Sequence, residues 1–202
     1  MADDRHPNLR HLPFGENVAP LTDFSEWDIF PFEVDGPLRL RVLGEPADEE
    51  PARSGESGPE DCHACAKPDA EYVWTDEDWR LTALRAPSAC PIVVLLEPRL
   101  HADFGDLPPV LAAGLVPVMQ RVERAIMGLG GVGRVHISRW GDGAAHFHLW
   151  FLARPLGVDQ MRGLFMPVWD NALPKTGVDT WRANLASVAA SLAREGGTAH
   201  AG

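Results

Sequence analysis

One short segment with a two-residue repeat constrains the fold of this chain more than any other feature. Residues 145–153 read AHFHLWFLA, and the alternation of a β-strand places His146, His148 and Trp150 on one face. The intervening residues are apolar and share the opposite face, which is expected to lie in a core. The segment therefore predicts a sheet with one buried face and two neighbouring imidazoles on the other.

Further apolar runs predict the rest of an antiparallel sheet. Residues 92–96 are continuously apolar, which is typical of a central strand. Gly141, Asp142 and Gly143 form a hairpin-turn signal just before the alternating segment. The strand candidates together are residues 71–74, 79–85, 92–96, 132–140 and 145–153.

Three other segments carry the repeat of amphipathic helices. Between positions 111 and 129 apolar side chains recur every three or four residues, and Gly130 and Gly131 end the pattern. Pro117 is expected to kink this helix or to mark its true first turn. Two further helices are predicted at residues 159–169 and 179–194. Strands, a long helix, a hairpin and tail helices in this order indicate an α+β domain.

The two ends of the chain lie outside this predicted core. Within residues 1–43, two short extended segments at 27–32 and 38–43 predict an N-terminal hairpin extension. Residues 44–61 contain seven acidic side chains and no large apolar one, so they predict an acidic, flexible linker. Residues 62–157 are then the core, and residues 158–202 are a C-terminal helical tail.

The charge of the chain limits its partners. Eighteen Lys and Arg against 29 Asp and Glu give a net charge of −11, which repels a nucleic-acid polymer. No apolar run approaches the roughly 20 residues of a membrane span, and the first residues lack the apolar region of a signal peptide. We therefore expect a cytoplasmic protein that binds neither nucleic acid nor membranes. A small anionic substrate is compatible with this charge if basic groups gather locally.

A pair of cysteines is a candidate start of a metal site. Cys62 and Cys65 are separated by two residues, and zinc sites commonly begin with this spacing. A redox dithiol and two incidental thiols are the alternatives. Zinc would need two further ligands, for which histidines are the candidates, because Cys90 is expected to be a small buried apolar residue. His101, which follows the strand candidate at 92–96, is one of them.

The two histidines of the alternating segment also allow more than one interpretation. His146 and His148 can be surface residues on an exposed face of the sheet. They can also both bind a single metal ion. The residues alone leave these alternatives open.

Taken in order, these motifs resemble the histidine-triad superfamily. The Cys-x-x-Cys pair is followed by an apolar strand that ends in Pro-x-x-His at His101, then by a long helix, and then by a strand with the two spaced histidines. The pattern is similar to the zinc-containing branch that includes galactose-1-phosphate uridylyltransferase, and it covers about residues 62–155. The resemblance implies a histidine-triad-like antiparallel sheet, a nucleotide substrate and a homodimer.

The resemblance also implies a role for each motif residue. A structural zinc would be bound by Cys62, Cys65, His101 and His146. His148 would be the nucleophile, which attacks the α-phosphorus of a nucleotide and forms a covalent nucleotidyl-imidazole. In the family, the backbone carbonyl of the first motif histidine, here His146, fixes the tautomer of the second.

The expected substrate contacts depart partly from the family pattern. Where the family has His or Gln, this chain has Trp150, which can donate its indole N–H to a phosphoryl oxygen but cannot act as an acid near neutral pH. In place of the family's Gly-rich phosphate-binding segment stand Ser138, Arg139, Gly141 and Gly143. Arg139 and the two glycine amides would supply local positive potential, and a plain hairpin turn is the alternative.

The sequence thus predicts a nucleotide phosphate hydrolase or nucleotidyl transferase with a histidine nucleophile and a structural zinc. One alternative is a catalytically weak nucleotide-binding or regulatory protein on the same zinc scaffold. Another is a zinc hydrolase in which both motif histidines bind a catalytic metal ion.

Overall fold

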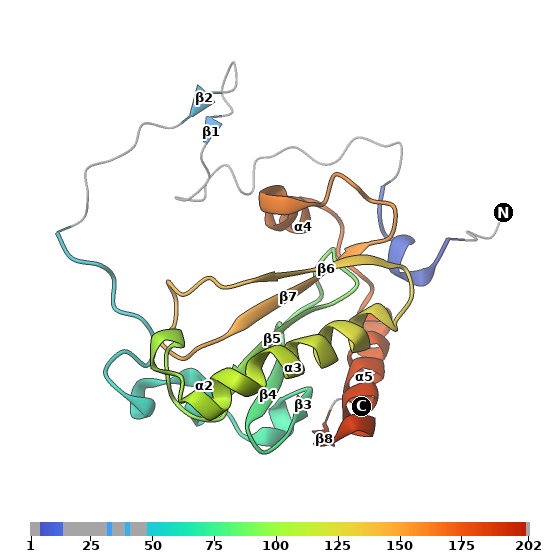
Figure 1. Ribbon diagram of the computed structural model, residues 1–202. Helices are drawn as coiled ribbons and strands as arrows, with labels where there is room; N and C mark the ends of the chain where they lie inside the picture. Colours follow the sequence, from blue (N-terminus) through green and yellow to red (C-terminus); the bar gives the residue numbers. More distant parts are fainter. Residues whose placement is uncertain (1–4, 14–31, 34–38, 41–47, 201–202) are drawn as a thin grey trace.

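Six antiparallel strands form the main sheet of the computed structural model, which describes residues 5–13, 32–33, 39–40 and 48–200 (Figure 1). Their order across the sheet is β6-β7-β5-β4-β3-β8. The strands are β3 (Trp74–Thr75), β4 (Trp79–Ala83), β5 (Val93–Pro98), β6 (Val132–Ser138), β7 (Leu149–Pro155) and β8 (Thr198–Ala199). The prediction of an α+β fold on an antiparallel sheet is confirmed.

Two long helices, α3 (Pro109–Met127) and α5 (Val178–Glu195), lie against one face of this sheet (Figure 1). Val94 and Phe151 on the central strands join Ile126 and other apolar residues of both helices in one buried cluster. The apolar face of the strands, which repeats every two residues, therefore packs against the apolar stripes of the two helices.

The helix α3 begins two residues before the predicted segment, and Pro117 lies inside it rather than at its first turn. Its end is closed by Gly128, whose backbone N–H bonds to the carbonyl of Arg124 at 3.0 Å. Gly130 and Gly131 then adopt φ angles of +70° and +64°, which favour glycine and turn the chain toward β6.

The opposite face of β5 and β7 packs against a second buried cluster. Val93 and Leu152 belong to it together with Cys90, and the buried position of Cys90 is as expected. The other buried members are Leu12, Ala89, Val158, Met161, Met166 and Leu173. The shorter helical elements are η1 (Pro7–Leu9), η2 (Pro59–Asp61), α2 (His63–Ala66), η3 (Asp69–Glu71), η4 (Phe104–Asp106), η5 (Gly163–Phe165) and α4 (Met166–Ala172).

The predicted strand at residues 145–153 is too long at its beginning. The strand β7 begins at Leu149, and Ser138 of β6 pairs with Trp150, so residues 139–148 form a long connection instead of a tight hairpin turn. Backbone groups in this connection bond elsewhere: Ala145 N–H donates to Ser54 and Phe147 N–H donates to the Ala102 carbonyl. These bonds replace the pairing with β6 that the alternation predicted.

The structure describes parts of both chain ends. β1 (Phe32–Glu33) pairs antiparallel with β2 (Arg39–Leu40) in a two-stranded sheet separate from the main one, and the rest of the predicted hairpin segments lies outside the described residues. In the tail, Gly163 at φ +61° interrupts the predicted helix at 159–169, so α4 begins only at position 166. The edge strand β8 was not predicted. Within the described residues, no helix is long and apolar enough to cross a membrane.

Candidate metal centre and catalytic pocket

Four side chains from three separate segments of the chain meet beside the sheet. They are the predicted metal ligands Cys62, Cys65, His101 and His146. Their ligand atoms all lie within 4.8 Å of one another. The Cys62 Sγ is 3.4 Å from His146 Nδ1, and the Cys65 Sγ is 3.4 Å from His101 Nδ1. Two thiols and two imidazole nitrogens are a common ligand set of structural zinc.

Different elements bring these ligands together. Cys62 caps the short helix α2 and Cys65 lies within it, so one turn presents both thiols. His101 follows the end of β5, and His146 lies in the connection before β7. Cys62 and His146 are buried, with exposed fractions of 2% each, so the centre is closed to solvent on that side.

The far nitrogens of both histidines are held by backbone carbonyls. His101 Nε2 is 3.0 Å from the Gly55 carbonyl, and His146 Nε2 is 2.8 Å from the Pro98 carbonyl. Nε2–H therefore donates outward and leaves Nδ1, the atom that faces the thiols, without a proton. Burial lowers the pKa of His146, which favours the same neutral form. These orientations fit a bound zinc ion.

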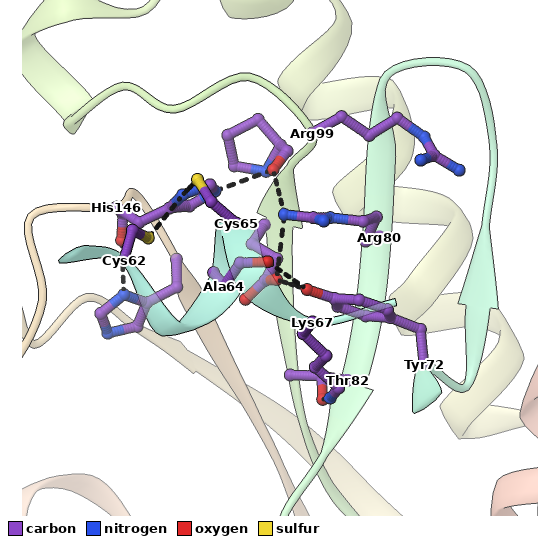
Figure 2. A network of polar contacts seen from close by, with 12 residues as sticks. Cys62, Ala64, Cys65, Lys67, Tyr72, Arg80, Thr82, Arg99 and His146 are labelled. Carbon is purple, nitrogen blue, oxygen red and sulfur yellow. Dashed lines mark hydrogen bonds and ion pairs between the residues drawn. The ribbon is translucent and has the colours of Figure 1, made fainter. Parts of the chain in front are cut away.

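A buried polar network supports the centre from the side of β4 and β5 (Figure 2). The Pro98 carbonyl that holds His146 also accepts from the Arg80 guanidinium at 3.4 Å. Arg80 pairs with Glu97 at 3.5 Å, and the Tyr72 hydroxyl donates to Glu97 at 2.6 Å. Burial and the neighbouring Glu97 raise the pKa of Tyr72 well above its usual range, so this hydroxyl remains a donor.

Residues 53–58, which we call the strap, come from the predicted flexible linker but make specific contacts. Ser54 forms a parallel bridge with Ala144, through bonds from its N–H to the Gly143 carbonyl at 3.1 Å and from the Ala145 N–H to its own carbonyl at 3.0 Å. The Arg53 guanidinium pairs with the Asp103 carboxylate at 2.8 Å. The prediction of a linker thus fails for this part, because backbone bonds and one ion pair replace the missing apolar contacts.

The ion pair of the strap persists over a wide pH range. Asp103 binds Arg53 through one carboxylate oxygen and Arg139 through the other, at 2.8 and 2.7 Å. Burial works to raise the pKa of Asp103, but hydrogen bonds from Arg53, from the Phe104 backbone N–H and from Arg139 outweigh it and hold the pKa at about 2. The carboxylate is therefore ionised at neutral pH, and it joins the strap to the connection before β7.

Replacing Gly55 with alanine is expected to destabilise the protein by about 1–3 kcal/mol, because Gly55 has a φ of +78° that disfavours other residues. A Cβ there would lie 2.8 Å from His101 Cε1 and 3.0 Å from Cys62 Cβ. Thermal unfolding and zinc content measure the effect on stability and on the centre. Gly105→Ala is the matched control, because a Cβ at Gly105 meets nothing within 4 Å. Equal unfolding temperatures for the two variants would contradict the prediction.

His148 lies next to the centre but does not belong to it. Its Nδ1 is 2.9 Å from the His146 carbonyl, so Nδ1–H donates to that oxygen. Nε2 is then the unprotonated nitrogen with a free lone pair. Because His148 is outside the four-residue cluster, the geometry gives no support to a catalytic metal held by both motif histidines.

A pocket of about 490 Å³ opens in front of His148. Trp140 and Trp150 form an aromatic wall, with ring centroids 5.5 Å apart, and Trp150 lies 6.4 Å from the His148 ring. Trp150 Nε1 is buried and has no hydrogen-bond partner within the described residues. The expectation that this N–H binds a phosphoryl oxygen therefore stays a prediction.

The predicted phosphate-binding segment contributes less to the pocket than expected. Gly143 is among the lining residues, whereas Ser138, Arg139 and Gly141 are not. Arg139 turns toward Asp103, and the Gly141 carbonyl lies 3.3 Å from the Arg53 guanidinium. Because Arg139 pairs with Asp103 and does not line the pocket, it does not supply the positive potential in the pocket that the sequence predicted.

Several lining residues were missed by the sequence analysis. Ser54 comes from the strap, and Lys67 and Glu97 come from the end of α2 and from β5. The position of Lys67, two residues after the second thiol, could have indicated that Lys67 lies near the metal centre, because both thiols are fixed on α2. Nothing in the composition of residues 44–61 indicated Ser54.

Comparisons with known proteins give matches among solved structures. No protein-family profile matches the chain, and no curated protein sequence matches it. A zinc-bound histidine triad family protein from Mycobacterium smegmatis is similar at 24% identity and a TM-score of 0.48, over 68% of this chain and 97% of that chain. A histidine triad protein from Bradyrhizobium japonicum is similar at 22% identity and a TM-score of 0.48, over 60% of this chain and 89% of that one.

A third similar structure is a histidine triad protein from Marinobacter aquaeolei, at 17% identity and a TM-score of 0.49, over 61% of this chain and 88% of that one. These proteins carry the family name that the motifs indicated. The narrower resemblance to the uridylyltransferase branch stays a prediction.

Proposed function

We propose that this chain is a nucleotide phosphate hydrolase or nucleotidyl transferase in which His148 is the nucleophile. The observation that carries the proposal is the 2.9 Å contact between His148 Nδ1 and the His146 carbonyl. In the neutral imidazole this contact places the lone pair on Nε2, on a residue that lines a pocket of about 490 Å³. An imidazole in this form can attack a phosphorus atom without losing a proton first.

The proposed reaction has two steps. The Nε2 lone pair of His148 forms a bond to the α-phosphorus of a nucleotide, and the bond from phosphorus to the leaving group breaks. Water or another acceptor then attacks the same phosphorus and releases His148. The His146 carbonyl holds the imidazole in place throughout and stabilises the positive charge on the ring by accepting the Nδ1–H.

The residues of the metal centre fit zinc in a structural role. Cys62, Cys65, His101 and His146 would hold it, and four protein ligands leave no position for a reacting water. Zinc would supply a cross-link between α2, the end of β5 and the connection that contains His146. Through His146, this cross-link would position the carbonyl that orients His148.

A covalent intermediate is the direct test of this function. The purified protein is mixed with nucleoside phosphoramidates, dinucleoside polyphosphates and nucleotide sugars, and intact mass is measured after rapid quenching. We expect a mass increase of one nucleoside monophosphate unit on His148. Turnover without any such adduct, under conditions that trap a fast second step, would contradict the nucleophilic role.

A second candidate is a nucleotide-binding or regulatory protein with little catalysis. The observation that favours it is Trp150 in the lining of the pocket, because an indole N–H does not protonate a leaving group near neutral pH. Nucleotide binding measured by calorimetry, with no turnover of the same substrate panel, would favour this candidate over the enzyme.

Substituting Trp150 with histidine is expected to speed up reactions with basic leaving groups. An indole cannot protonate a departing amine near pH 7, so the unmodified protein should react much faster with phosphate or sugar-phosphate leaving groups than with amines. An imidazole at this position can give a proton, and it should narrow the difference by about tenfold or more. Single-turnover rates on both substrate types measure the effect. Equal rates in the unmodified protein would mean that another residue supplies the proton.

A further inference from the structure

One cation stands out in the lining of the pocket. Lys67 is the one Lys or Arg side chain among the described residues that line it. The whole chain has two lysines, Lys67 and Lys175, and a net charge of −11. A positive side chain in the same pocket as His148 therefore contrasts with the acidic character of the protein.

The position of Lys67 is fixed by its neighbours (Figure 2). Its Nζ donates to the Thr82 hydroxyl and lies 4.3 Å from the centre of the Tyr72 ring. Lys67 also follows directly on α2, whose two thiols belong to the metal centre. The ammonium group is thus held at one place in the pocket wall by a hydroxyl and an aromatic face, both of which are uncharged.

The charge of Lys67 is not used by an ion pair within the described residues. Glu97 and Glu71 are the nearby carboxylates, and neither forms an ion pair with Lys67 within the described residues. Glu97 pairs instead with Arg80 at 3.5 Å and accepts from the Tyr72 hydroxyl at 2.6 Å. An ammonium group has three N–H donors, and Thr82 takes one of them. Lys67 therefore keeps donors and a positive charge for an anion that enters the pocket.

The other polar features of the pocket define what this anion does. Trp150 supplies no proton, so this position favours a leaving group that is stable as an anion. A phosphate is such a leaving group, and an ammonium group is a suitable partner for its oxygens. Trp150 thus does not protonate the leaving group, and the ammonium group compensates the negative charge that the leaving group carries.

We propose that Lys67 binds the departing phosphate when the α-phosphorus of the nucleotide is linked through oxygen to a second phosphate. This inference rests on the proposed function. In the first step His148 Nε2 forms a bond to the α-phosphorus while the bond from that phosphorus to the bridging oxygen breaks. The electron pair stays on this oxygen, which leaves as part of a phosphate anion paired with Lys67, so no proton transfer is required.

The test compares two substrates that differ in the second phosphate. One is a nucleoside 5′-diphosphate, and the other is the 4-nitrophenyl ester of the same nucleoside 5′-monophosphate, whose leaving group is acidic but is not a phosphate. We measure the ratio of their kcat/KM values. Lys67→Met should lower this ratio about tenfold to a hundredfold, because a charge-assisted contact to the phosphate is lost. Lys67→Arg should restore most of it.

Lys175→Met is the matched control, because Lys175 bonds to backbone carbonyls near α4 and does not line the pocket. Its ratio should equal that of the unmodified protein. A second measurement needs no variant: inorganic pyrophosphate should compete with the nitrophenyl ester in the unmodified protein. Zinc content and unfolding temperature check that Lys67→Met is folded.

The outcomes separate this inference from the proposed function. If both substrates react and Lys67→Met leaves their ratio unchanged, or if pyrophosphate does not compete, Lys67 does not bind the leaving phosphate although the protein is an enzyme. If neither these two substrates nor any member of the substrate panel above reacts with the unmodified protein, the proposed function is wrong and the role of Lys67 is refuted with it.

Discussion

Replacing His148 with alanine is expected to reduce turnover at least about a thousandfold, because the substitution removes the proposed nucleophile, the imidazole that the His146 carbonyl orients. The same variant should keep its metal and nearly all of its stability, since His148 is outside the metal cluster and partly exposed. Steady-state rates, zinc content and thermal unfolding of the purified variant measure the three properties.

The neighbouring histidine provides the contrast. His146→Ala removes a buried ligand and its bond to the Pro98 carbonyl, so both metal content and stability should fall together with activity. His136 on β6 is a control, because it does not line the pocket. If His146→Ala and His148→Ala behave alike in zinc content and unfolding, the division of roles between ligand and nucleophile is wrong.

The second large effect is expected for Cys62→Ser. Its thiol is buried and lies 3.4 Å from His146 Nδ1, so the substitution removes a ligand from the closed side of the centre. The free energy of zinc binding is part of the free energy of folding, and its loss should cost several kcal/mol. For a chain of this size, each kcal/mol corresponds to about 2–4 °C in Tm, so we expect a fall of about 10 °C or more.

The measurement for Cys62→Ser is metal analysis together with thermal unfolding. The unmodified protein should contain about one zinc per chain, and the variant should contain much less. Cys90→Ala is the control for metal content, because Cys90 is outside the four-residue metal cluster and is buried in the second apolar cluster. A zinc-free protein whose unfolding temperature does not change on adding zinc would refute the structural role.

The sheet and the long helix were accessible from the sequence because their apolar residues follow a simple repeat. Residues 92–96 and the stripe along α3 are buried by the elements that the repeats predict. The same reasoning extended β7 too far, because the apolar alternation continues through Phe147 although the backbone there bonds to Ala102. A repeat reports which side chains are buried, and not which backbone pairs with which.

The candidate site was predicted where motif residues carry it and missed where backbone contacts carry it. The grouping of Cys62, Cys65, His101 and His146 followed from the resemblance. The contacts of the strap could not be predicted, since Ser54 binds its neighbours through backbone hydrogen bonds that do not depend on the residue type. Arg139 was predicted to face the substrate, because its partner Asp103 is 36 residues away and no local sequence pattern predicts that ion pair.

The strap also moves the border of the folded unit. The motif begins at Cys62, yet the carbonyl that orients His101 belongs to Gly55, and the neighbouring Ser54 holds the connection before His146. A shortened chain that starts at the first cysteine would carry all four ligands and still lack the group that sets the tautomer of one of them. The shortest fragment that keeps every group of the metal centre therefore starts no later than Arg53. This residue lies inside the segment 44–61, whose composition is typical of a linker.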